Sequence, residues 1–144
     1  MSNLNSRLVL VVSDDEGASH AIGRCALSNS ASVYVVHDRV PEAVSALSAW
    51  LAAVVVDVRS TELADSAWQV IELLRQNSET VRTPVVLRYD RSHAISSDLL
   101  LSFEPIYAVE AERGLEAACE ALAAALGNRA DWPTHISRHL IAGR

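Results

Sequence analysis

The sequence predicts an α/β fold, with a doubly wound, five-stranded parallel sheet and helices on both of its faces. Two patterns in the chain of 144 residues carry this prediction. Continuous apolar runs rich in valine are typical of strands that are buried on both faces of a parallel sheet. Between them, apolar residues recur at steps of three and four, which is the spacing of a helix with one buried side. Strict alternation of the two patterns favours right-handed strand–helix–strand units.

The predicted elements follow one another without an internal repeat. The apolar runs interpreted as strands lie at Leu8–Ser13, Ser32–His37, Ala53–Val58, Pro84–Tyr89 and Pro105–Val109. The periodic segments interpreted as helices lie at Ala18–Ser28, Pro41–Leu51, Asp65–Asn77, Ser92–Leu101 and Glu112–Leu126. Pro41 suits a first helical position, where its missing amide costs nothing, and Gly127 suits the end of the last helix. The buried face of that helix is predicted to be Leu115, Ala118, Cys119, Leu122 and Leu126.

Composition and charge exclude several classes of protein. The length indicates one domain, predicted at residues 1–127, with a C-terminal tail at residues 128–144 that forms a short helix or the stub of a linker. No apolar stretch reaches the roughly 18 residues of a membrane span, and the polar N-terminus does not resemble a signal peptide, so a cytoplasmic location is predicted. The net charge of −6 argues against binding to nucleic acid or anionic membranes. Cys25 and Cys119 lack the spacing of a zinc site or disulfide framework and are interpreted as small buried thiols.

Acidic residues lie at or directly after the C-terminal ends of three predicted strands. Asp14 and Asp15 follow the first strand, Asp57 lies in the third, and Glu110 follows the fifth. In a doubly wound sheet, functional groups lie at the carboxyl ends of the strands, where the strand order reverses. If these strands are neighbours, four carboxylates converge on one pocket, and their mutual repulsion requires a compensating charge. The sequence therefore predicts either a cation site or a disabled catalytic site.

Over roughly residues 7–126 the chain resembles the receiver domain of two-component response regulators, which has a flavodoxin-like fold. The resemblance rests on the acidic pair after the first strand, on AAVVVD ending at Asp57, on SAWQVIELLRQN leading into TPVVL, and on YAVEA at the fifth strand. It implies that Asp57 is the phosphoacceptor. It also implies that Asp14, Asp15, Asp57 and the backbone carbonyl of Arg59 hold magnesium, a cation that prefers oxygen ligands and neutralises charge in phosphoryl transfer.

The other half of the receiver motif is altered. The hydroxyl residue that contacts the phosphoryl group in the family corresponds to Tyr89, and the lysine that pairs with it corresponds to Glu110. Tyr107 corresponds to the switch aromatic of the family. Exchanging attraction for repulsion at ~4 Å changes the interaction with a phosphoryl group by several kcal/mol. Phosphorylation is therefore expected to be poorly stabilised and poorly relayed.

Three arginines near these positions are candidates to replace the missing lysine. They are Arg59, Arg88 and Arg91, and a guanidinium suits carboxylate or phosphate oxygens. Strand alternation directs Arg88 and Tyr89 to opposite faces, so at most one of them enters the site easily. Arg59 is favoured as the partner of Asp57 or Glu110.

Apolar residues near the fourth helix indicate an interface with a partner or a second copy of the chain. Three consecutive leucines are more than one buried stripe consumes, so at least one is expected to be exposed. The interface candidates are Leu99, Leu100, Phe103 and Ile106. In the tail, His135 and His139 have the spacing of metal ligands on a helix, but no third ligand is evident nearby.

The leading hypothesis is a divergent receiver-like signalling module of a two-component pathway, without catalytic residues, that binds a histidine kinase or an effector. The alternative is a functional phosphoacceptor in which Asp57 is phosphorylated with magnesium and an arginine replaces the lysine. A third hypothesis, an α/β enzyme or small-ligand sensor that uses the acidic cluster, has no supporting nucleophile–base pair or phosphate-binding glycine loop in the sequence.

Overall fold

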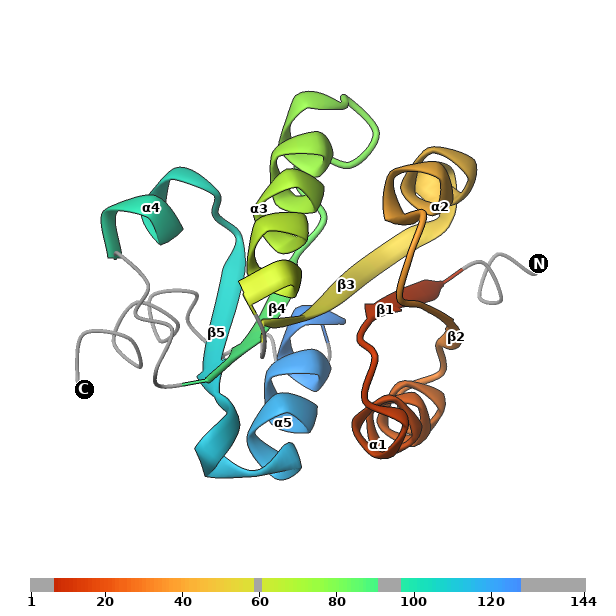
Figure 1. The fold of residues 1–144 in the computed structure, drawn as a ribbon. Helices are drawn as coiled ribbons and strands as arrows, with labels where there is room; N and C mark the ends of the chain where they lie inside the picture. The colour runs from red at the N-terminus through yellow and green to blue at the C-terminus, as the bar shows by residue number, and fades with distance from the viewer. Residues whose placement is uncertain (1–6, 59–60, 91–96, 128–144) are drawn as a thin grey trace.

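The chain folds into a five-stranded parallel sheet with helices on both faces, as a computed structural model of residues 7–58, 61–90 and 97–127 shows (Figure 1). The strands are β1 (Leu8–Val12), β2 (Ser32–Val36), β3 (Leu51–Val58), β4 (Val85–Tyr89) and β5 (Ile106–Glu110). The helices are α1 (Glu16–Ser28), α2 (Val40–Leu47), α3 (Thr61–Gln76), α4 (Ser97–Ser102) and α5 (Leu115–Ala125). The strand order β2-β1-β3-β4-β5 confirms the predicted doubly wound topology.

Two apolar layers hold the sheet between its helices. Helices α1 and α5 cover one face, and α2, α3 and α4 lie on the other (Figure 1). Alternate residues of each strand supply the two layers: in β3, Val54 and Val56 pack toward α3, whereas Ala53 and Val55 pack toward α1 and α5. Because β1, β3 and β4 are internal strands, both of their faces are buried, which explains their continuous apolar runs.

The element boundaries differ from the predicted ones by a few residues. The second helix ends at Leu47, and a 3₁₀ turn (η2, Ser48–Trp50) leads directly into β3. Pro41 lies in the first turn of α2, as predicted. A second 3₁₀ turn (η3, Ala111–Arg113) precedes α5. Gly127 has a φ of +82°, and its amide donates to the carbonyl of Ala124, so it ends α5 in the left-handed conformation that glycine favours.

The half-buried Arg75 holds the loops that lead into β4 and β5. Arg75, in the last turn of α3, donates hydrogen bonds to the carbonyls of Phe103 and Pro105, both at 2.8 Å, and of Thr83 at 2.7 Å. Burial lowers the pKa of Arg75, because the charged form loses hydration there. These charge-assisted bonds fix the segments that enter β4 and β5.

None of the helices that the structure describes is long and apolar enough to cross a membrane. The predicted tail at residues 128–144, with His135 and His139, lies outside the described residues, as does Arg59.

Candidate functional site at the carboxyl end of the sheet

Asp57 lies near the end of β3, on the face of the sheet that α1 and α5 cover. Its side chain is only 2% exposed. The strand reads apolar up to this residue, so the chain carries a carboxylate into a buried position that normally holds an uncharged side chain. A buried charge requires compensation by hydrogen bonds and an opposite charge.

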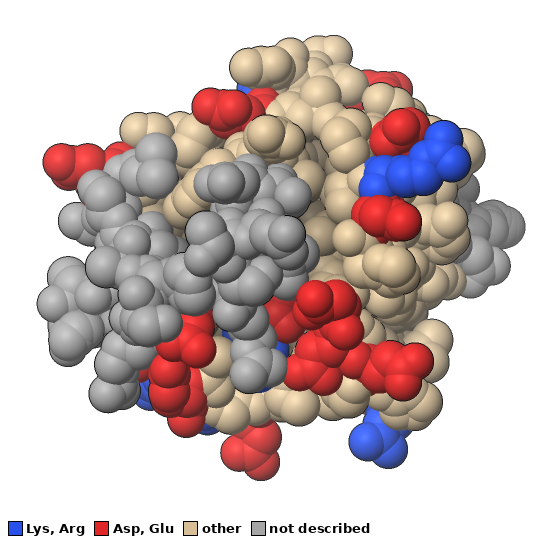
Figure 2. Space-filling model, in the orientation of Figure 1, with Lys and Arg blue, Asp and Glu red and all other residues tan. Residues whose placement is uncertain are grey.

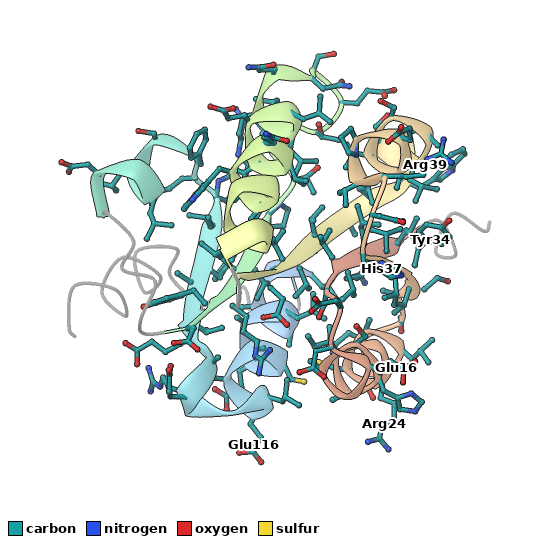
Figure 3. The ribbon with its side chains drawn as sticks, in the orientation of Figure 1. Glu16, Arg24, Tyr34, His37, Arg39 and Glu116 are labelled. Atoms are coloured by element: carbon teal, nitrogen blue, oxygen red, sulfur yellow. The ribbon has the colours of Figure 1, made fainter. Side chains whose placement is uncertain are left out.

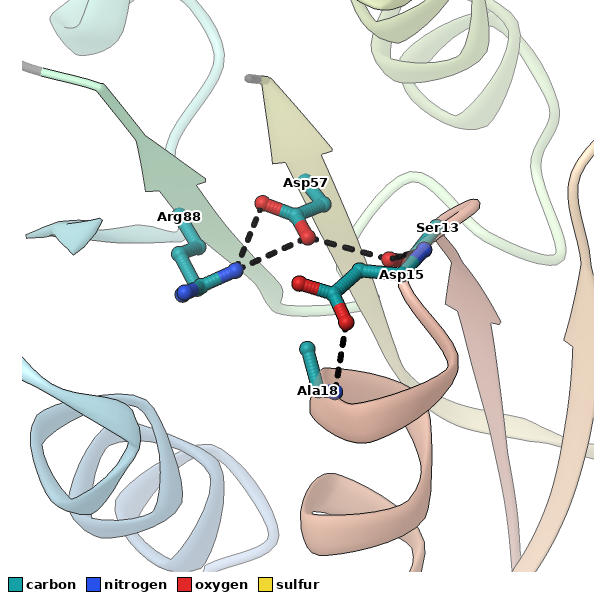
Figure 4. A network of polar contacts seen from close by, with 5 residues as sticks. All are labelled: Ser13, Asp15, Ala18, Asp57 and Arg88. Carbon is teal, nitrogen blue, oxygen red and sulfur yellow. Dashed lines mark hydrogen bonds and ion pairs between the residues drawn. The ribbon is translucent and has the colours of Figure 1, made fainter.

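Arg88 supplies the opposite charge from the neighbouring strand. In the parallel register of β3 and β4, Asp57 pairs with Arg88, so both side chains point to the same face. Nη1 of Arg88 lies 3.0 Å from Oδ1 and 2.9 Å from Oδ2 of Asp57 (Figure 4). The Arg88 side chain is 8% exposed, and its Nε has no hydrogen-bond partner among the described residues. The two residues form a buried ion pair between central strands.

A serine connects this ion pair to the start of α1. The hydroxyl of Ser13 donates to Oδ2 of Asp57 at 3.0 Å and accepts from the amide of Asp15 at 3.1 Å (Figure 4). The carboxylate of Asp15 in turn accepts from the amide of Ala18 at 3.1 Å, which makes it the N-cap of α1. The network therefore links the phosphoacceptor candidate to the loop between β1 and α1.

The charges of the pair are strongly coupled. At 2.9 Å and an effective dielectric of ~20, two unit charges attract by about 6 kcal/mol, of which desolvation cancels a large part. Removal of either partner would leave an uncompensated buried charge, which typically costs roughly 3–5 kcal/mol. The folded state therefore depends on both members of this ion pair.

Solved structures share this architecture, although no protein-family model and no curated protein sequence matches the chain. A sensor protein from Polaromonas sp. JS666 superposes with a TM-score of 0.62 and 18% identity, covering 85% of this chain and 97% of its own. A response regulator from Hahella chejuensis gives a TM-score of 0.61 and 16% identity, with 84% and 92% covered. A response regulator in red light signaling of R. palustris gives 0.54 and 15%, with 82% and 90% covered.

The chain has the fold of a response-regulator receiver domain. In this receiver fold, Tyr89 and Glu110 occupy the ends of β4 and β5 and pair with each other in register. Tyr89 is 5% exposed and belongs to the apolar layer on the α3 side, opposite to Asp57. Alternation along β5 places Glu110 toward that side as well, because Val109 packs on the α5 side. Tyr89 and Glu110 therefore lie on the opposite face of the sheet from Arg88.

The side chain of Tyr107, which the sequence predicts to be a switch aromatic, is buried. Tyr107 is 7% exposed and packs in the layer under α5. Burial raises the pKa of its phenol, because the charged form loses hydration.

The four carboxylates predicted to share one pocket are not grouped there. Asp14 is exposed, Asp15 caps α1, and Asp57 is bonded to Arg88 and Ser13. Among residues 7–58, 61–90 and 97–127, no three His, Cys, Asp or Glu side chains lie together in a way that could hold a metal ion. The magnesium site stays a prediction, and Arg59, the partner favoured from the sequence, lies outside the described residues.

The acidic pair lies beside an open surface hollow and not at a closed site. Asp14, Asp15, Glu16, Gly17 and His37 line this hollow, which has a volume of about 660 Å³. Acidic side chains gather at the surface near the start of α1 (Figure 2). Asp15 therefore belongs both to this open hollow and to the network that joins Ser13 to the buried Asp57.

The surface proposed for an interface is partly buried. Leu100 is 1% and Ile106 is 2% exposed, so neither side chain is available at the surface as that prediction requires. Phe103 is half-buried and stacks on Trp68, with ring centroids 6.1 Å apart. Leu101 is exposed, which agrees with the expectation for at least one of the three leucines. The side chain of Leu99 lies outside the described part of the structure.

Exposed apolar side chains also occur at the opposite edge of the sheet, which the sequence did not indicate. Leu27 of α1 and Tyr34 and Val35 of the edge strand β2 are all exposed. Leu27 and Val35 line a groove of about 670 Å³ between α1 and β2. Tyr34 projects from the same edge, and Glu16 and Arg24 of α1 line the groove (Figure 3).

Proposed function

We propose that this chain is a receiver-like signalling module of a two-component pathway, diverged at its phosphorylation site, that acts by binding other proteins and not by a catalytic activity of its own. The observation that carries the proposal is the Asp57–Arg88 pair. A carboxylate that attacks a phosphoryl group must present an oxygen in line with the leaving group. Here both oxygens accept bonds from Arg88, one also accepts a bond from Ser13, and burial opposes the approach of a phosphodonor.

In this ion pair, Arg88 supplies the positive charge that a divalent cation would otherwise provide to Asp57. A guanidinium 2.9 Å from the carboxylate already compensates its charge, and a magnesium ion beside it would be repelled. Among the described residues, no group of three His, Cys, Asp or Glu side chains competes with Arg88 for this role. We therefore expect millimolar magnesium to leave the urea midpoint of the protein unchanged, and a clear stabilisation by magnesium would contradict this part of the proposal.

The phosphorylation test is direct. The full chain is incubated with a small acyl phosphate and magnesium, and its intact mass is measured beside an Asp57→Asn control. The proposal expects no adduct in either protein. An adduct that appears in the wild type and not in the control would overturn it.

A second function, a working phosphoacceptor, is supported by one detail of the same site. Nε of Arg88 is buried without a hydrogen-bond partner in the described structure, so a phosphoryl oxygen added to Asp57 would find a donor close by. This reading expects an Asp57-dependent adduct whose lifetime shortens in Arg88→Met. It also expects that Glu110→Lys lengthens the lifetime, since the substitution adds a cation at the end of β5.

A further inference from the structure

The two cysteines, 94 positions apart in the chain, lie side by side between α1 and α5. The thiol of Cys25 on α1 donates to the carbonyl oxygen of Cys119 on α5 at 3.3 Å. The sulfur of Cys119 lies 4.0 Å from the carbonyl oxygen of Ala21, one turn before Cys25. A helical side chain leans toward the turn that precedes it, so the sulfur of Cys25 also lies at the level of Ala21. The two sulfur atoms therefore lie at the same position along the axes of the two helices.

The helix pair has the spacing that a disulfide requires. Packed helices are typically 8–10 Å apart and their Cα atoms lie ≈ 2.3 Å from each axis, so facing Cα atoms are roughly 3–5 Å apart. Disulfides span Cα separations of about 4.4–6.8 Å, and a small offset along the helices brings the pair into that range. Small buried residues on the two helices, Ala26 of α1 and Ala118 of α5 among them, are consistent with a close approach.

The environment of the thiols assigns them different roles. Burial, a hydrogen bond with the thiol of Cys119 and the charge of Cys119 together raise the pKa of Cys25 to about 12. Cys25 therefore stays protonated near neutral pH, so we assign the first attack on an oxidant to the other thiol of the pair. Both residues are only half-buried, which leaves them accessible to a small oxidant.

We propose that Cys25 and Cys119 form a reversible oxidation site, at which a peroxide converts the two thiols into a disulfide that joins α1 to α5. The Cys119 thiolate attacks one oxygen of hydrogen peroxide, the O–O bond breaks, and Cys119 sulfenic acid and hydroxide form. The sulfur of Cys25 then attacks the sulfenic sulfur and expels hydroxide, which takes the Cys25 proton. In total, two thiols and one peroxide give one disulfide and two waters, and two electrons pass from sulfur to oxygen.

Such a bond joins the two helices that cover the face with Asp57 and Arg88. It closes a long loop, which restricts the unfolded chain. For a chain of this size we expect the thermal midpoint to rise by roughly 10 °C on oxidation. The gain should vanish after treatment with a dithiol reductant.

The test uses the full chain with one equivalent of hydrogen peroxide. The proposal expects an intact mass lower by two hydrogen atoms, loss of both free thiols, and a peptide containing Cys25 linked to one containing Cys119. The yield should not change over a tenfold dilution, because the reaction is intramolecular. Cys25→Ser should instead accumulate the sulfenic acid on Cys119, which a dimedone adduct reports.

Other outcomes contradict the proposal. These are a wild-type product that gains oxygen without a disulfide, a disulfide between two copies whose yield falls on dilution, and thiols that resist peroxide in the folded protein. The wild-type measurements are sufficient by themselves if Cys25→Ser fails to fold.

Discussion

Replacing Arg88 with methionine removes the cation beside Asp57 and keeps much of the apolar bulk of the side chain. The carboxylate of Asp57, 2% exposed, would then keep only the Ser13 hydroxyl among the donors described for it. The attraction lost is about 6 kcal/mol at 2.9 Å with an effective dielectric of ~20. Since methionine needs no desolvation, the net loss of unfolding free energy should be roughly 3–5 kcal/mol.

A double-mutant cycle isolates the pair. Asp57→Asn alone leaves the guanidinium of Arg88 buried without a carboxylate and should also destabilise by a few kcal/mol. The double variant Asp57→Asn/Arg88→Met contains neither charge, so it should be more stable than the sum of the single losses predicts, by up to about 3 kcal/mol. Urea unfolding at neutral pH measures all four proteins.

The exposed Arg24 provides the control, because Arg24→Met should change the stability by no more than about 0.5 kcal/mol. The reasoning would be refuted if Arg88→Met cost under about 1 kcal/mol and the cycle showed additive effects. In that case the ion pair would be incidental, and the main argument against phosphorylation of Asp57 would fail.

Three further predictions concern other parts of the molecule. Arg75→Ala leaves four backbone carbonyls without their charged donor and should cost about 3 kcal/mol in urea unfolding, whereas exposed Arg82→Ala should cost less than about 0.5 kcal/mol. Asp15→Ala removes the N-cap of α1 and should cost about 1 kcal/mol, with Asp14→Ala near neutral; equal losses would contradict this. Because the pKa of Cys25 rises from 9.0 to about 12 on folding, its stabilising contribution is complete below pH 9 and is lost toward pH 12. The urea midpoint should therefore fall less steeply over this range in Cys25→Ala, and an unchanged slope would argue against the raised pKa.

The fold was predictable because its signal is distributed over many residues. Continuous valine-rich runs specify strands that are buried on both faces, and a misjudged residue at one end changes little. The missed details are local ones, such as the 3₁₀ turn at Ser48–Trp50 between α2 and β3. The proximity of Cys25 and Cys119 had no sequence signal at all, since it arises from the contact between two helices 94 positions apart.

The candidate site was only half predictable for a related reason. A motif locates Asp57, but predicting that Arg88 contacts it requires the register of β3 and β4. One signal was present in the sequence. Arg88 is a charge inside the buried run PVVLRY, and a charge in a central strand needs a partner on a neighbouring strand at the same level. The alternation of side chains along β4 predicts which face of the sheet Arg88 lies on. It does not predict which residue of β3 lies opposite Arg88.

The position of Arg88 changes what the acidic site can do. The receiver motif that the sequence resembles places its cation at the end of the fifth strand, where this chain has Glu110. Here the cation is on β4, level with Asp57, and it contacts both oxygens of the carboxylate. A cation at the end of the fifth strand forms its main ion pair only when a phosphoryl group is added. Arg88 already pairs with the carboxylate of Asp57, so phosphorylation would add little further interaction energy. We therefore expect the partner affinity of this chain to be independent of phosphodonors, and a partner whose binding changes with an acyl phosphate in the wild type, and not in Asp57→Asn, would contradict that expectation.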